Sequence, residues 1–125
     1  MSHWNDKQVA INVFVGKTFK KVTNTGDAIT FESDDGTVLE MSHDQDCCEH
    51  VRVEDICGDL QDLMDPPIIE AREDTNRKEP VPELGDDSFT WTLYNFRTMK
   101  GSVTIRWLGE SNGYYSESVE IWQVV

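Results

Sequence analysis

Apolar and polar residues alternate with a period of two along most of the chain, which is the pattern of half-buried β-strands. Two of the intervening turns carry strong signals, because Gly26 follows Asn24 closely and Gly36 follows a pair of aspartates. Glycine and asparagine tolerate the positive φ values that tight turns need. The segments that we predict as strands are 17–23, 28–32, 37–42, 68–72, 89–98, 102–108 and 114–125.

One segment, 53–64, departs from this alternation and predicts a helix. Its apolar residues recur at the helical spacing i, i+3, i+7 and i+10, in Val53, Ile56, Leu60 and Leu63. Acidic residues in the first turn suit the helix dipole, and two consecutive prolines end the helical pattern. We therefore predict an α+β fold, in which one main helix packs on an antiparallel, curved sheet of about six or seven strands.

The chain has the length of a single domain covering residues 1–125. Residues 1–12 are weakly patterned and contain a short strand or a turn at 9–11. Residues 73–87 are polar, rich in acidic side chains and interrupted by two prolines. A segment of this composition has few side chains to bury, so we expect an exposed acidic loop there.

The sequence also indicates a compartment. No apolar run reaches the roughly 20 residues that a membrane-spanning helix needs. The first residues lack the basic and apolar segments of a signal peptide. Three cysteines, an odd number, do not make a disulfide framework. We therefore expect a cytoplasmic protein that does not bind a membrane.

The net charge of −13 is unevenly distributed. Residues 27–87 contain twenty of the 24 acidic residues and four of the 11 basic residues, a difference of −16. The remainder carries seven bases and four acids, a difference of +3. Direct binding of nucleic acid is not expected, because phosphate recognition needs a stripe of lysine and arginine. An acidic face can serve solubility alone, or it can bind a basic protein surface.

All three cysteines and two of the three histidines lie between residues 43 and 57. Zinc uses such ligands, and the candidate metal-binding residues are His43, Cys47, Cys48 and Cys57. The spacing contains no Cys-x2-Cys pair, and adjacent cysteines in an extended chain point to opposite sides. A cysteine near a helix N-terminus can also act as a nucleophile, with a histidine as its base. We expect no bound cofactor, and a metal-binding or thiol enzyme centred on this segment is the alternative function.

No known catalytic motif occurs in the chain, so our leading prediction is a non-enzymatic binding protein. Its candidate partner-binding residues on the predicted helix are Asp55, Asp59, Asp62 and Asp65. They fall along one side of that helix, where they would face a basic partner or imitate the phosphates of DNA. An ordinary solvated helix face has the same arrangement of acidic residues. Tyr114 and Tyr115 are further candidates, since tyrosine buries a large area at low entropy cost.

Four segments of the chain are distinctive as short motifs. They are Gln45-Asp46-Cys47-Cys48-Glu49, Glu54-Asp55-Ile56-Cys57-Gly58-Asp59-Leu60, Gly101-Ser102-Val103-Thr104-Ile105-Arg106-Trp107 and Glu110-Ser111-Asn112-Gly113-Tyr114-Tyr115-Ser116-Glu117. Together they resemble a family of small proteins of unknown function from bacteriophage and prophage genomes, over residues 15–125. The resemblance implies a small protein made in a bacterial cytoplasm, and small acidic phage proteins often bind and block a host protein. On this basis the expected partner is a host or phage protein with a basic surface.

Overall fold

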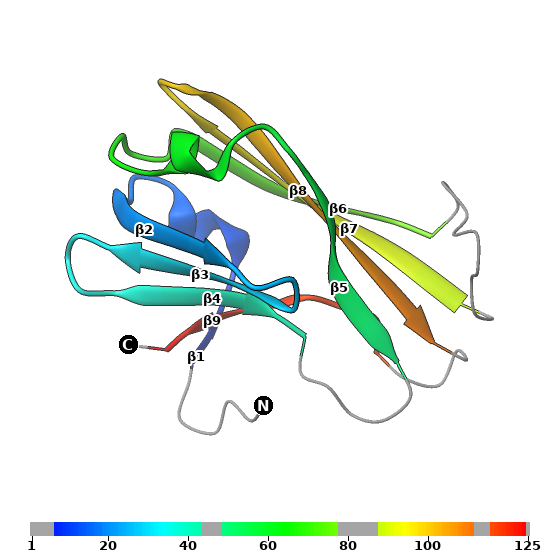
Figure 1. Cartoon of the computed structure of the whole chain (residues 1–125). Coiled ribbons are helices and arrows are strands. Elements are labelled where there is room, and N and C mark those ends of the chain that lie inside the picture. Colours follow the sequence, from blue (N-terminus) through cyan, green and yellow to red (C-terminus); the bar gives the residue numbers. More distant parts are fainter. Residues whose placement is uncertain (1–6, 44–48, 78–87, 112–115, 125) are drawn as a thin grey trace.

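The computed structural model describes residues 7–43, 49–77, 88–111 and 116–124 (Figure 1). Within these residues the chain forms nine strands in two antiparallel sheets, with two short 3-10 turns. In chain order the elements are β1 (Lys7–Val9), η1 (Ile11–Phe14), β2 (Phe19–Asn24), β3 (Ala28–Ser33), β4 (Val38–Ser42), β5 (His50–Cys57), η2 (Leu60–Leu63), β6 (Glu70–Asn76), β7 (Ser88–Thr98), β8 (Gly101–Ser111) and β9 (Glu120–Gln123).

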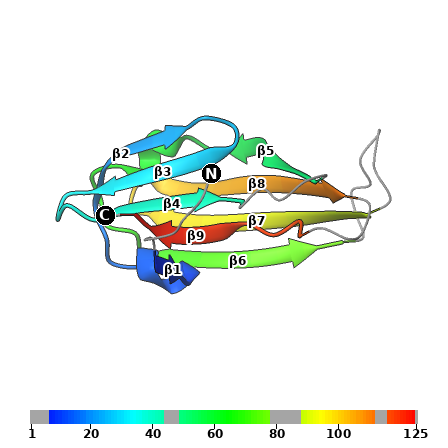
Figure 2. The same ribbon diagram turned by 90° about the horizontal axis from the view of Figure 1, so that it is seen from below.

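The two sheets are layered on each other. The first has the strand order β1-β9-β4-β3-β2, and the second has the order β5-β8-β7-β6. Figure 2 shows that the edge strands β1 and β6 lie along one side of the molecule, whereas β2 and β5 lie along the other. The fold is therefore a two-layer β structure, and the predicted α+β class is wrong.

The predicted helix at 53–64 is replaced by β5, a bend and the short turn η2. A bulge between Val53 and Asp55 shifts the register of β5 against β8. As a result Val53 pairs with Trp107 and Ile56 pairs with Ile105, so two residues three apart both face the core. Gly58, at φ +110°, then ends the strand. The bulge in a strand thus imitated the i, i+3 spacing of a helix.

The strands predicted from alternation are confirmed, with different limits at the acidic loop and at the C-terminus. β6 continues to Asn76 and pairs with β7, so residues 73–76 belong to a strand. These residues are polar because β6 is an edge strand whose side chains remain largely exposed. The rest of the predicted loop, 78–87, lies outside the described residues. The predicted last strand is represented by the four residues of β9.

Aromatic side chains fill the space between the sheets. Phe14 of η1 and Phe31 of β3 have ring centroids 4.9 Å apart in an edge-to-face arrangement. Phe96 of β7 lies 5.1 Å from Phe14, which joins the two layers. Phe19 completes the group at 5.3 Å from Phe31. These contacts bury all four rings and form the centre of the core.

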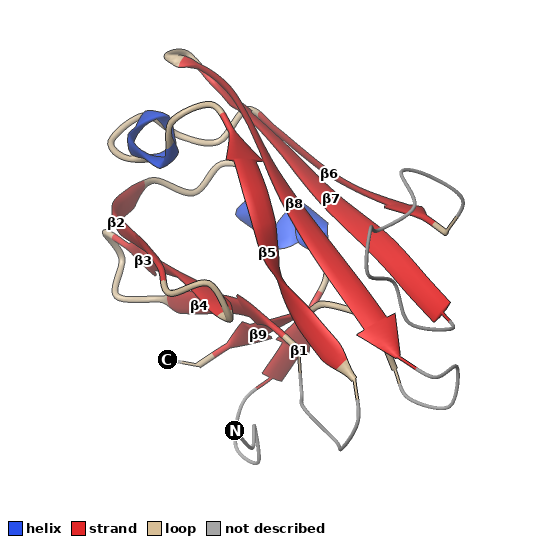
Figure 3. Cartoon of the chain, turned by 45° about the vertical axis from the view of Figure 1, so that its right-hand side comes forward, coloured by secondary structure: helices blue, strands red, loops and turns tan. Residues whose placement is uncertain are grey.

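β7 and β8 each contain 11 residues, whereas the strands of the first sheet contain three to six. The strands of the two sheets cross at an angle (Figure 3). One half of the long hairpin packs on the aromatic core through Phe96. The inward side chains of the other half include the polar residues Thr90, Thr92 and Ser111 beside the buried Trp107, and the two threonines form part of one wall of the candidate site.

Candidate functional site

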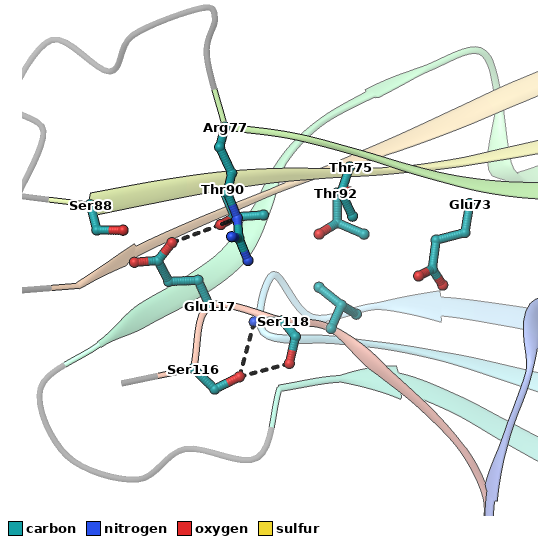
Figure 4. A pocket seen from close by; sticks show the side chains of 10 residues that line it. Glu73, Thr75, Arg77, Ser88, Thr90, Thr92, Ser116, Glu117 and Ser118 are labelled. Atoms are coloured by element: carbon teal, nitrogen blue, oxygen red, sulfur yellow. Dashed lines mark hydrogen bonds between the residues drawn. The ribbon is translucent and has the colours of Figure 1, made fainter. Parts of the chain in front are cut away.

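A polar pocket of about 290 Å³ lies between the inner face of the β6–β7 pair and the segment 116–119 (Figure 4). Nearly all of its lining side chains carry a hydroxyl, carboxylate or guanidinium group. They are Glu73, Thr75, Arg77, Ser88, Thr90, Thr92, Ser116, Glu117, Ser118 and Val119. A concave site with convergent polar groups is the usual form of a ligand-binding pocket, although such sites are generally more apolar than this one.

Glu117 projects into the pocket from below and is 9% exposed. The Thr90 hydroxyl donates a hydrogen bond of 2.7 Å to one carboxylate oxygen, and the Ser111 hydroxyl donates to the other. A buried carboxylate needs such donors, because it has lost the hydrogen bonds of water. β7 and β8 therefore each supply one hydroxyl that holds the Glu117 carboxylate in place.

Gly109 of β8 allows the segment 116–119 to approach the sheet closely. A Cβ atom at this position would lie 2.5 Å from the Glu117 carbonyl oxygen and 2.8 Å from the Glu117 Cβ. Any side chain here would therefore displace the segment from β8. The glycine thus sets the depth at which the Glu117 carboxylate enters the pocket.

Arg77 and Glu73 place opposite charges at the two ends of the pocket (Figure 4). The Nε of Arg77 donates to the Thr90 hydroxyl oxygen at 3.3 Å, and Thr90 in turn donates to Glu117. One hydroxyl therefore links the arginine to the buried carboxylate. Glu73 lies four residues earlier on the same face of β6, about 13 Å along the strand. With one arginine and two glutamates, the pocket has a formal charge of −1.

Tyr94 lies behind the Glu73 end of the pocket and donates a hydrogen bond to the Val119 carbonyl at 3.3 Å. Burial raises the pKa of the Tyr94 hydroxyl far above its ordinary value, and the negative charges of Glu73 and Glu120 raise it further. The hydroxyl therefore stays protonated, and Val119 and the Glu73 carboxylate are the two acceptors within its reach.

His43 and Glu49 form a buried pair that supports the opposite side of the segment 116–119. The His43 Nε2 lies 2.9 Å from a Glu49 carboxylate oxygen, and the Nδ1 lies 2.7 Å from the Ser118 carbonyl oxygen. A carbonyl oxygen can only accept, so Nδ1 carries a proton. Both ring nitrogens are therefore engaged in this arrangement, and His43 fixes the pocket wall.

The structure separates the two predicted metal ligands that it describes. His43 lies beside Glu49, next to the first residue of β5, whereas Cys57 is the last residue of that strand. The length of β5 is about 23 Å at the usual rise of a strand. Cys57 is exposed and pairs with Thr104. Within the described ranges no three His, Cys, Asp or Glu side chains are grouped to hold a metal ion, and Cys47 and Cys48 lie outside those ranges.

The predicted partner-binding aspartates do not share one helix face, because the helix is absent. Asp55 lies on the outer face of β5, 3.1 Å from Arg106. Asp59 caps η2 by accepting from the Gln61 amide at 2.9 Å, and Asp62 and Asp65 follow it. Three of the four candidates therefore remain together around η2. Tyr114 and Tyr115 lie outside the described residues.

A second segment joins these aspartates at the same end of the molecule. The Asp34 amide donates to the Thr18 carbonyl at 3.0 Å, and the Asp65 amide donates to the neighbouring Phe19 carbonyl at 2.9 Å. The turn between β3 and β4 therefore lies beside the residues that follow η2. We call this surface the acidic end, and it comprises Asp34, Asp35, Asp59, Asp62 and Asp65.

The carboxylate of Asp35 stays ionised at physiological pH. The Thr37 amide and hydroxyl and the Ser33 hydroxyl hydrogen-bond to it and lower its pKa from 3.8 to about 2. Lys17 lies 3.7 Å from Asp35, and Lys100 lies 3.8 Å from Asp65. Two lysines therefore balance only part of the charge of five aspartates.

The other acidic residues of 27–87 that the structure describes are distributed over several strands. Those of β3 and β4 belong to the first sheet, and those of β5 and β6 lie on opposite edges of the second.

The polar pocket was not predicted. The signal that would have indicated it is the pair Thr90 and Thr92, which share the inward face of β7 with Tyr94 and Phe96.

Comparisons with known proteins place the chain in one family. Neither the curated proteins nor the solved structures contain a match. In the part of the chain that the structure describes, no helix is long and apolar enough to cross a membrane. Residues 12–121 match a family described as a domain of unknown function, which agrees with the predicted membership of an uncharacterised family. The chain belongs to the DUF7448 family.

Proposed function

We propose that this protein is a non-enzymatic binding protein whose acidic end contacts a basic surface of a host or phage protein and blocks that partner's function. The observation that supports this proposal is the convergence of five aspartates from two distant segments of the sequence. Asp34, Asp35, Asp59 and Asp65 are all exposed there. The resemblance to phage and prophage proteins suggests the bacterial setting of the partner.

The acidic end suits association that is guided by charge. A cluster of one sign attracts an oppositely charged surface and raises the rate of association, and dissolved salt screens that attraction. The two lysine contacts nearby are exposed, and pairs of this kind contribute little. The carboxylates therefore remain available to a partner.

Charge neutralisation with a matched control tests the proposal. In the triple variant D59N/D62N/D65N, asparagine retains the capping ability needed at position 59. Asparagine also tolerates the positive φ of 84° at position 65. The control E54Q/D55N/E70Q removes the same charge from carboxylates that already contact Arg52, Arg106 and Arg97. Both variants change the net charge equally.

Each protein is immobilised and used to capture partners from bacterial lysate at low and at high salt. We expect a specific partner that the wild type and the control retain at low salt and that the D59N/D62N/D65N variant loses. Equal retention by all three proteins, or no specific partner at either salt concentration, would contradict the proposal.

A further inference from the structure

We infer that the polar pocket between β6 and the segment 116–119 binds an alkylammonium or guanidinium group, with the Glu73 carboxylate as its counter-charge. The inference uses residues remote from the acidic end and does not depend on it. The chemical group is the same whether it belongs to a free small amine or to a lysine or arginine side chain of a partner. The order of the charged and hydroxyl side chains along the pocket favours a positively charged ligand.

The first step concerns the charge of Glu73. Among the described residues, no lysine, arginine or histidine nitrogen lies within 4 Å of its carboxylate. Arg77 lies at the other end of the pocket, where Thr90 links it to Glu117. The positive and negative groups at that end offset each other, so the uncompensated charge of the pocket is the one at Glu73. An anionic ligand would face two carboxylates.

The second step concerns Thr92, which lies opposite Thr75 in the register of β6 and β7. Thr92 is 3% exposed, and its hydroxyl points into the pocket (Figure 4). It forms no hydrogen bond with any other described residue. The hydroxyl oxygen is accessible from the pocket that Thr92 lines. An N–H group that enters the pocket would satisfy this oxygen.

The third step concerns the remaining acceptors and the available space. The Ser116 and Ser118 hydroxyls line the pocket across from Thr92 and hydrogen-bond to each other at 2.7 Å. An ammonium group has three donors and a guanidinium group has five, so either has enough donors for Glu73 and the hydroxyls together. A volume of about 290 Å³ is enough for one such group with a short alkyl chain.

Titration of the full chain with n-butylguanidinium and n-butylammonium, followed by amide NMR signals, tests the inference. We expect shifts confined to residues near Glu73, Thr92 and Ser118, and no such shifts with butyrate. E73Q should weaken binding at least tenfold, and T92V should weaken it by a smaller factor. The matched control E70Q changes a carboxylate on the same strand that contacts Arg97, and it should bind like the wild type.

A capped pentapeptide with one central arginine distinguishes the two sources of the cation. At least tenfold tighter binding than n-butylguanidinium would assign the pocket to a partner's side chain, and equal or weaker binding would assign it to a free amine. The D59N/D62N/D65N variant should still bind both probes, which separates this inference from the proposed function. Absence of binding by either small cation, unchanged affinity in a folded E73Q variant, or a preference for butyrate would overturn the inference.

Discussion

The inward faces of β7 and β8 consist of two halves with opposite chemistry. The apolar half, defined by Tyr94, Phe96, Val103 and Ile105, joins the aromatic core between the sheets. The polar half, defined by Thr90, Thr92, Gly109 and Ser111, faces the segment 116–119 and the pocket, and the buried Trp107 opposite Thr92 lies where the two halves meet. Both halves belong to one continuous hairpin with an unbroken register. The difference therefore arises from side chains and from what lies opposite them, while the backbone is common to both.

This difference indicates separate roles for the two halves. Buried apolar area is the main source of folding stability, and the apolar half supplies it. The polar half buries the Glu117 carboxylate and lines a pocket with hydroxyl groups, and such groups contribute little net stability. Residues that stabilise the fold less than another side chain would at the same position often mark functional sites. We infer that the polar half is present for binding.

The largest effect is expected from truncation in the apolar half. Phe31 is fully buried and contacts the rings of Phe14, Phe19 and Phe96. Phe31→Ala should lower the free energy of unfolding by about 4 kcal/mol, because it leaves a cavity among three rings. Urea denaturation measures this value. A loss below about 1 kcal/mol would mean that the aromatic cluster is not the centre of the core.

A smaller effect is expected where the polar half contacts the segment 116–119. Gly109→Ala places a methyl group against the backbone and Cβ of Glu117. We expect a loss of about 2 kcal/mol, since overpacking at a rigid contact typically costs this much. The amide NMR signals of Glu117 and Ser118 should shift most. Unchanged signals at these two residues would show that the segment does not lie on β8.

Exchanging the chemistry of the two halves at single positions should give one effect of similar size and the smallest effect of all. Val103→Thr introduces a hydroxyl into the apolar half and should cost about 2 kcal/mol. Thr92→Val removes the hydroxyl without a described partner from the polar half, and it should leave stability within about 0.5 kcal/mol of the wild type or raise it. Thermal melts of both variants provide the test. Equal losses would contradict the distinction between the halves.

The sequence was sufficient to predict most of the strands, but it did not predict β5, which begins at His50. Alternation located β2, β3, β4, β7 and β8, and the end of β4 at Ser42 agrees with the prediction. The bulge in β5 could not be distinguished from a helix, because Val53 and Ile56 have the same spacing in both. A bulge depends on the pairing with β8, and this pairing joins residues some fifty positions apart.

The candidate site was harder to predict because its contacts cross the whole chain. His43 is a candidate metal ligand in the sequence, and its contact with the Ser118 carbonyl, 75 residues later, was not predicted. Thr90 and Glu117 are 27 residues apart and meet only because Gly109 has no side chain. The acidic end likewise depends on backbone hydrogen bonds to Thr18 and Phe19. These contacts cannot be predicted from the spacing of residues along the sequence.

Replacement of Glu73 by leucine tests most directly the claim that the polar half is present for binding. Urea unfolding is followed for the wild type and for E73L, with and without n-butylammonium. The account predicts that E73L is at least as stable as the wild type without the cation, and that the cation raises the unfolding midpoint of the wild type alone. A less stable E73L protein, together with equal stabilisation of both proteins by n-butylammonium, would contradict it.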